Sequence, residues 1–197
     1  MNTDTLRYAG FWPRFASLWL DMLIMIPLSA ATFWCSSQFR LFDVYYFIPG
    51  ELFSVFYCVY LVKRYGGTPG KLLMGIKICK LDGSAIGYRE AVLRYLPDFI
   101  LGFLMSIALI ISVFHMTDAE YHSLTYMKRS MRMIELAPSW YKPLQWIQNI
   151  WIWSEFLVLL TNRKRRAIHD FIAGTVVIHK LPKDTIEFNP PIAIQPN

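Results

Sequence analysis

Charged residues are scarce in this sequence. Only 17% of its 197 residues are Asp, Glu, Lys or Arg, against about 25% in an average soluble domain. Hydrophobic residues make up 55% of the chain and aromatic residues 16%. A soluble fold of this size leaves much of its surface in water, so it has no core large enough to hide this much apolar surface. The composition therefore predicts an integral membrane protein.

The sequence also lacks the residue sets of disulfide-rich proteins, metalloproteins and hydrolases. Its three cysteines, Cys35, Cys58 and Cys79, are far apart, which excludes a disulfide framework and zinc-ligand spacing. No serine or cysteine is presented with a base that would activate it as a nucleophile. Residues 66–71 resemble a phosphate-binding loop only loosely, because the spacing is wrong and Leu72 replaces the required Ser or Thr. We expect no enzymatic activity, no cofactor and no bound metal.

Four segments are apolar enough to cross a membrane as helices. The hydrocarbon core of a bilayer requires about 20 apolar residues in helical form. Such segments cover residues 15–36, 44–62, 91–114 and 144–161. Pro49 and Gly50 interrupt the second segment, whose outer end we expect to be bent or unwound. The predicted fold class is an all-α transmembrane four-helix bundle.

The connections between the spans contain further structure. Residues 76–80 and 175–179 are short runs rich in β-branched residues, and they predict a small cytoplasmic β element. Residues 119–136 predict an amphipathic helix that lies on the external surface of the membrane. Separately, residues 66–71 predict a turn against the headgroups, which the Lys71 side chain reaches. Residues 1–182 would form one domain, and residues 183–197 a disordered tail.

The distribution of basic residues predicts the orientation. Seven Lys and Arg residues lie between the second and third spans, four follow the fourth span directly, and the link between the first two spans has only Arg40. Basic loops remain in the cytoplasm. Both termini and the middle loop are therefore predicted to be cytoplasmic, and residues 116–143 to be outside. The net charge of +6 is best explained by anionic lipid headgroups as partners, not by nucleic acid.

Three sequence motifs resemble those of the RDD family of bacterial membrane proteins. They occur in the expected order: AGFWPRFA at residues 9–16 followed by Asp21, GTPGK at residues 67–71 followed by Gly75 and Ile78, and RAIHD at residues 166–170 followed by AGTVV at residues 173–177. The family is named for one Arg and two Asp, which here correspond to Arg14, Asp21 and Asp170. The resemblance implies a multi-pass protein of the bacterial inner membrane.

The resemblance implies two alternative functions. Some members of the family are associated with monovalent cation/proton exchange, and related domains occur in proteins that assist membrane-protein quality control. A transporter built from four spans without an internal repeat is expected to work as a homo-oligomer. The alternative is a scaffold or accessory factor that transports nothing and binds other membrane proteins.

Charged residues at membrane depth are the candidate functional residues. Such a residue costs about 2.5 kcal/mol or more, so it usually has a partner or a task. Arg14 and Asp21 lie on one helical face. The hypotheses for Asp21 are an ion pair, with Arg14 or with a basic residue near the closing motif, and a cation or proton site tuned by Arg14. Asp98 ends a Glu90–Arg94–Asp98 ladder of four-residue spacing, and it is expected to form salt bridges there or to share a polar site with Asp21.

The remaining two candidates are Glu155 and Asp170. Glu155 lies near the middle of the fourth span with no charged residue within four positions. It is expected to be buried and neutral, to bond another helix, or to titrate. Asp170 is expected to accept backbone N–H groups or to pair with a neighbouring Arg, fixing the turn that follows it.

Overall fold

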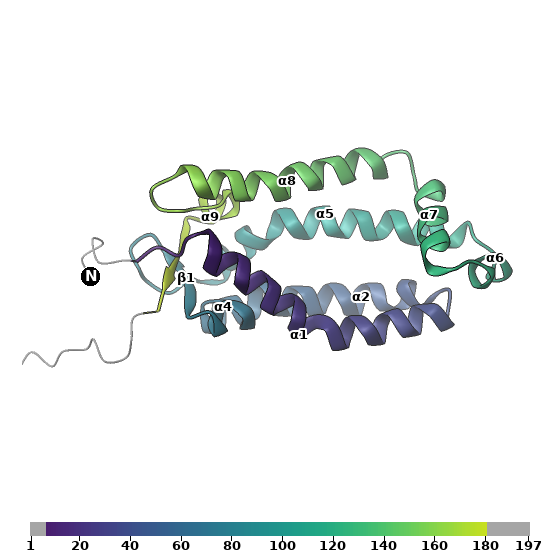
Figure 1. Ribbon diagram of the computed structural model, residues 1–197, viewed down its shortest axis with the longest axis horizontal. Helices are drawn as coiled ribbons and strands as arrows, with labels where there is room; N and C mark the ends of the chain where they lie inside the picture. The colour runs from purple at the N-terminus through teal and green to yellow at the C-terminus, as the bar shows by residue number, and fades with distance from the viewer. Residues whose placement is uncertain (1–6, 181–197) are drawn as a thin grey trace, which may run out of the picture.

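Long apolar helices dominate the structure, a computed structural model that describes residues 7–180. Three helical segments of this part are long and apolar enough to cross a membrane: α1 (Phe11–Gln38), Phe42–Leu73 and α5 (Tyr88–Phe114). α8 (Tyr141–Thr161) has 21 residues and runs beside them (Figure 1). Its amides Gln145, Gln148 and Asn149 keep it out of that apolar set. The predicted disordered tail lies outside the described residues.

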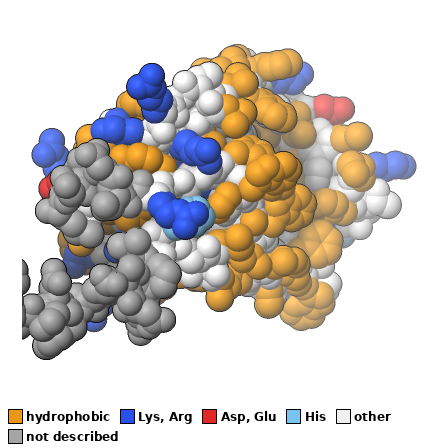
Figure 2. Space-filling view, turned by 60° about the vertical axis from the view of Figure 1, so that its left-hand side comes forward, with side chains coloured by type: hydrophobic (Ala, Val, Ile, Leu, Met, Phe, Trp, Pro, Cys, Tyr) orange, Lys and Arg blue, Asp and Glu red, His pale blue; other side chains and the backbone are white. Residues whose placement is uncertain are grey.

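Apolar side chains on these helices face outward. On α1 the side chains of Leu23 and Ile26 are 56% and 55% exposed, and Trp153 on α8 is 67% exposed. Figure 2, turned so that one end of the bundle comes forward, shows several Lys and Arg side chains around this end and a broad hydrophobic belt behind them. An apolar belt on long helices requires lipid as its solvent. The composition is therefore explained, and the chain is a membrane protein.

The second membrane segment differs from the prediction. It consists of α2 (Phe42–Val55), the π-helical turn η2 (Phe56–Tyr60), α3 (Leu61–Tyr65) and, after a turn at Gly66, α4 (Pro69–Leu73). α2 continues as a helix through Pro49 and Gly50, so the unwinding predicted as one alternative there is wrong. The irregularity comes nearly two turns later, at η2, where the backbone accommodates an extra residue. Turns of this kind often mark functional sites.

A two-stranded antiparallel sheet closes one end of the bundle, which we call the sheet end (Figure 1). Strand β1 (Ile76–Lys80) pairs with β2 (Thr175–His179), with Ile78 opposite Val177, and Tyr8 forms a further bridge to Ile178. This confirms the predicted β element. Its side chains form the main buried cluster together with residues of the N-terminal segment, the second membrane segment and the start of α5: Ala9, Val59, Val62, Ile76, Ile78, Ile86, Ala91 and Val177.

The opposite end is covered by two short helices, α6 (Asp118–Ser123) and α7 (Tyr126–Leu136). The single helix predicted over residues 119–136 is therefore wrong. The chain becomes extended at Leu124 and Thr125. The break lets α7 turn inward and place buried Arg129 over the Tyr121 ring, with 4.3 Å between the guanidinium carbon and the ring centroid. A cation over an aromatic face is a stabilising contact.

Candidate functional site

A cavity of about 440 Å³, lined by apolar and charged side chains, lies in the bundle near the sheet end. It is bounded by α1, η2, α4, α5, α8 and α9 (Ile168–Ala173). Its charged or titratable side chains include Arg14, Asp21, Lys71, Arg94, Asp98, Glu155 and His169. Four of the five residues singled out in the sequence thus line one cavity, although they come from three helices. The fifth, Asp170, is bonded to Arg14 and Arg94 of the cavity wall.

Asp170 is fully buried, and both of its oxygens are used. Oδ2 accepts Nη1–H of Arg14 at 2.6 Å and the backbone N–H of Ala167 at 3.1 Å. Oδ1 accepts Nη1–H of Arg94, and the Thr175 hydroxyl donates to it at 3.1 Å. Burial by itself raises the pKa of this carboxyl group. The positive charges of Arg94 and Arg14 outweigh burial and hold the pKa of Asp170 well below the usual range.

Arg14 connects the start of α1 to the closing motif. Besides its bond to Asp170, it donates from Nη2 to the carbonyl of Arg165 at 2.6 Å and from Nε to the carbonyl of Ala9 at 3.3 Å. The hypothesis that Arg14 pairs with Asp21 is wrong, because its partner is the buried carboxylate of Asp170. The helical spacing put both residues on one face, but it did not reveal a stronger acceptor 156 positions away.

Asp21 accepts hydrogen bonds from three neutral donors. Oδ1 accepts the Tyr57 hydroxyl at 2.5 Å and the Gly70 N–H at 2.7 Å, and Oδ2 accepts the Thr68 hydroxyl at 2.5 Å. These bonds join α1 to η2 and to α4. The approach is so close that a Cβ atom on Gly70 would lie 2.2 Å from the Ser17 carbonyl oxygen. Gly70 therefore serves close packing, which explains a glycine here without any phosphate.

Lys71 lines the cavity, so the expectation that it reaches outward to the headgroups is wrong. Its Nζ lies 3.4 Å from the Thr68 hydroxyl oxygen. The short helix α4 packs flat on α1, and this packing turns the Lys71 side chain inward. This is its one hydrogen bond within the described residues, and the negative charge of Asp21 also acts on the ammonium.

The predicted ladder on α5 is also wrong. Glu90 accepts the Gly87 N–H at 2.7 Å and lies 3.5 Å from the Lys80 ammonium. Arg94 turns to Asp170 and to the Thr175 hydroxyl, at 3.1 Å from the latter. Asp98 accepts the indole N–H of Trp151 on α8 at 2.9 Å. Each of the three residues contacts a partner on another element. A local ion pair at a helix surface contributes little to stability, so it does not hold these side chains in place.

Glu155 and His169 form a contact between α8 and α9. Glu155 Oε1 accepts the backbone N–H of His169 at 2.9 Å, and Oε2 lies 2.5 Å from His169 Nδ1. Nε2 of His169 is buried, has no hydrogen-bond partner within residues 7–180, and lies 3.9 Å from Asp170 Oδ1. Burial, reinforced by the Arg94 charge, lowers the pKa of His169. The imidazole is therefore neutral near pH 7, with one ring nitrogen facing a carboxylate.

The cavity residues that sequence reasoning did not single out include Tyr57, Lys71, Arg94 and His169. His169 and Lys71 belong to the recognised motifs, which was the available signal. Tyr57 carried none, because its position depends on η2. Arg94 was assigned to a local ladder, since its partner Asp170 follows it by 76 residues.

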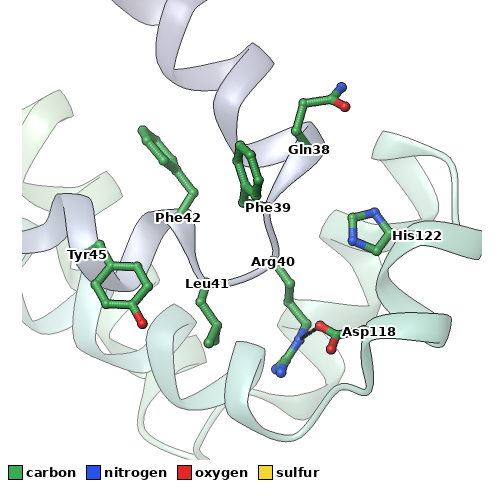
Figure 3. Close-up of a pocket in the computed structure, with 8 residues that line it drawn as sticks. All are labelled: Gln38, Phe39, Arg40, Leu41, Phe42, Tyr45, Asp118 and His122. Carbon is green, nitrogen blue, oxygen red and sulfur yellow. Dashed lines mark hydrogen bonds and ion pairs between the residues drawn. The ribbon is translucent and has the colours of Figure 1, made fainter.

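A second cavity, of about 450 Å³, lies at the opposite end, beside the link between α1 and α2. Figure 3 shows Arg40 facing Asp118 there, with Phe39 in the same link and Phe42 and Tyr45 in the first turn of α2. Arg40 donates to Asp118 at 2.5 Å and to the carbonyls of Val113 and Met116, both at 2.9 Å. Arg40 thereby satisfies carbonyls at the end of α5. This cavity is built around a structural clamp.

Comparison with protein families gives one match, in which the RDD family covers residues 8–174 of the chain. No curated protein and no solved structure matches this chain.

Proposed function

This chain belongs to the RDD family, and on that premise we propose that it exchanges a monovalent cation for protons across a bacterial inner membrane. One observation carries the proposal: the carboxylates of Asp21, Asp98 and Glu155, from α1, α5 and α8, line a single cavity in the membrane-spanning part of the chain. A carboxylate at this depth is costly unless it has a task. Binding a proton or a cation in turn is such a task.

The proposal includes four spans with α8 as the fourth. Tyr8, β1 and β2 are joined by backbone hydrogen bonds, so they lie on one side of the membrane. The chain must therefore cross the membrane an even number of times between β1 and β2. If α5 crosses it, α8 crosses it as well. The basic residues of the sheet end favour the cytoplasm for this side.

The hydrogen bonds favour different roles for the three carboxylates. Asp21 accepts three hydrogen bonds and holds α1 to η2 and α4, which suits a structural role. Within the described chain, Asp98 accepts a single hydrogen bond, from Trp151, and Glu155 has one oxygen facing the His169 ring. We assign cation and proton exchange to Asp98 and Glu155, with the neutral imidazole of His169 as proton acceptor.

Proton flux in everted membrane vesicles tests this assignment. After a pH gradient is established, Na⁺, Li⁺ or K⁺ is added to vesicles that contain the protein. We expect a cation-dependent collapse of the gradient that is lost in Asp98→Asn and in Glu155→Gln. Glu135→Gln on α7, at the opposite end and 66% exposed, is the matched control and should exchange normally.

Two results would contradict the proposal. One is no collapse beyond that of empty vesicles, with the protein shown to be folded and abundant. The other is unchanged exchange in both cavity variants. The first result would favour a scaffold that binds other membrane proteins, for which crosslinking of partners is the direct measurement. If exchange is seen, crosslinking also tests the homo-oligomer that four spans without a repeat would need.

A further inference from the structure

The cavity opens sideways into the apolar belt. α1 packs mainly on α4, and it has no extensive contact with α5. Leu18 on α1 and Asp98 on α5 both line the cavity, and both are exposed at the surface. The neighbouring side chains of Trp19 and Ile100 are 54% and 47% exposed and apolar. In a membrane protein, such a mouth faces lipid.

The walls of the cavity suit part of a lipid as well as an ion. Phe15, Leu18, Val62 and Leu159 supply apolar surface beside the charged side chains of the same cavity. The volume of about 440 Å³ falls within the ~300–1,000 Å³ typical of small-molecule sites. A bare cation would fill only a small part of it.

The charges around the cavity leave two needs unmet. Arg14 and Arg94 share Asp170, yet Arg94 bonds through Nη1 alone and has further N–H donors. Within the described residues, Lys71 has one hydrogen bond, the long contact to Thr68, so further N–H donors of its ammonium are unused. Within the described residues, the side-chain groups in direct contact with the Asp98 and Glu155 carboxylates are neutral, the Trp151 indole and the His169 imidazole. A ligand that satisfies both needs carries an anion and a cation.

We propose that the cavity binds the headgroup of an aminophospholipid from the surrounding membrane. Its phosphate lies on Lys71 and the free donors of Arg94, its primary ammonium lies on Asp98 and Glu155, and its acyl chains leave past Leu18. A purely anionic headgroup is disfavoured because it offers nothing to the two carboxylates. The ammonium occupies the place proposed above for the transported cation, but the inference does not rest on transport, since binding is measurable without flux.

Native mass spectrometry of the full chain in detergent, titrated with single phospholipids, tests this. We expect phosphatidylethanolamine to bind more tightly than phosphatidylglycerol, and also more tightly than phosphatidylcholine, which has the same phosphate but no N–H on its nitrogen. Lys71→Met should weaken phosphatidylethanolamine binding at least about tenfold, as loss of a charged hydrogen bond does. Asp98→Asn should remove the preference for phosphatidylethanolamine over phosphatidylcholine.

Two variants keep the test decisive. Lys128→Met, an exposed lysine on α7, is the matched control and should bind lipid as the unmodified chain does. Lys71→Arg keeps the positive charge and should retain binding even if Lys71→Met unfolds. Equal binding of the three lipids, or equal effects of Lys71→Met and Lys128→Met, would overturn the proposal. Full competition by soluble phosphoethanolamine at equal concentration would overturn it too, because the site would then recognise a free phosphate ester instead of a lipid.

Discussion

At the scale of single residues, Asp170 is the group on which most of the sheet end depends. It is fully buried and takes hydrogen bonds from α1, α5, β2 and its own helix. Two arginines compensate one buried carboxylate, and both arginines donate elsewhere as well. Removing one partner of such a buried pair is far costlier than the pair itself is stabilising, because the remaining charges stay buried without compensation.

Asp170→Asn is therefore expected to lower stability by about 3–5 kcal/mol. For a chain of this length this corresponds to a fall in Tm on the order of 10 °C, measurable by thermal unfolding in detergent. Asp82→Asn, in the exposed turn after β1, is the control and should leave Tm unchanged. Equal Tm values for the two variants would show that Asp170 is not the anchor.

The pH dependence of the Tm difference between the unmodified chain and Asp170→Asn follows from the lowered pKa of Asp170. A depressed pKa means that the carboxylate stabilises the fold fully above its unfolded value, about 3.9. This contribution is lost only as the pH falls through the lower folded-state pKa. The Tm gap between the unmodified chain and Asp170→Asn should thus be constant from pH 5.5 to 8. A gap that shrinks across this window would contradict the assignment.

At the scale of elements, the contact of α4 with α1 positions both Asp21 and Lys71. It exists because Gly70 has no side chain: a Cβ atom there would lie 2.2 Å from the Ser17 carbonyl and 2.7 Å from the Asp21 carboxyl carbon. Neither neighbour is the flexible end of a long side chain. The motif glycine thus determines how closely two elements pack, and thereby which residues reach the cavity.

A pair of glycine substitutions tests this packing. Gly70→Ala should force α4 away from α1 and cost more than about 3 kcal/mol, beyond ordinary overpacking. Gly102→Ala on α5, where an added Cβ would meet nothing within 4 Å, should stabilise its helix by about 0.5–1 kcal/mol. Thermal unfolding and membrane abundance report both. Similar effects of the two substitutions would refute a role in close packing.

At the scale of the whole molecule, the sheet fixes which segments share a side of the membrane. β1 follows the second membrane segment, β2 follows α8, and Tyr8 precedes α1, yet all three are joined by backbone bonds. Three chain segments that are distant in sequence thus meet at one end. α6 and α7 cover the other end (Figure 1).

Labelling of single cysteines in intact cells tests the proposed four spans. In a chain with Cys35, Cys58 and Cys79 replaced by Ala, a membrane-impermeant maleimide should modify Ser123→Cys on α6. It should modify neither Ser84→Cys, before α5, nor Lys164→Cys, after α8, because both are proposed to be cytoplasmic. All three positions are exposed. Opposite outcomes at residues 84 and 164 would mean that α8 does not cross.

The sequence by itself determined the membrane class, the approximate extent of the long helices and both strands. These properties depend on local composition and periodicity, which a single segment carries in full. It also predicted that Arg14, Asp21, Asp98, Glu155 and Asp170 need partners, because a charge at membrane depth is costly wherever it lies.

Only the tertiary structure decided which partners these residues have. Arg14 and Arg94 both form ion pairs with Asp170, instead of with Asp21 and with the neighbouring acidic residues of α5. The Lys71 side chain lines the cavity. In each case the partner lies on another element, and its strength as an acceptor depends on burial that no local pattern reveals. The π-helical turn and the break between α6 and α7 could not be predicted for the same reason. Each lowers local helix stability, and contacts with other elements compensate for this loss.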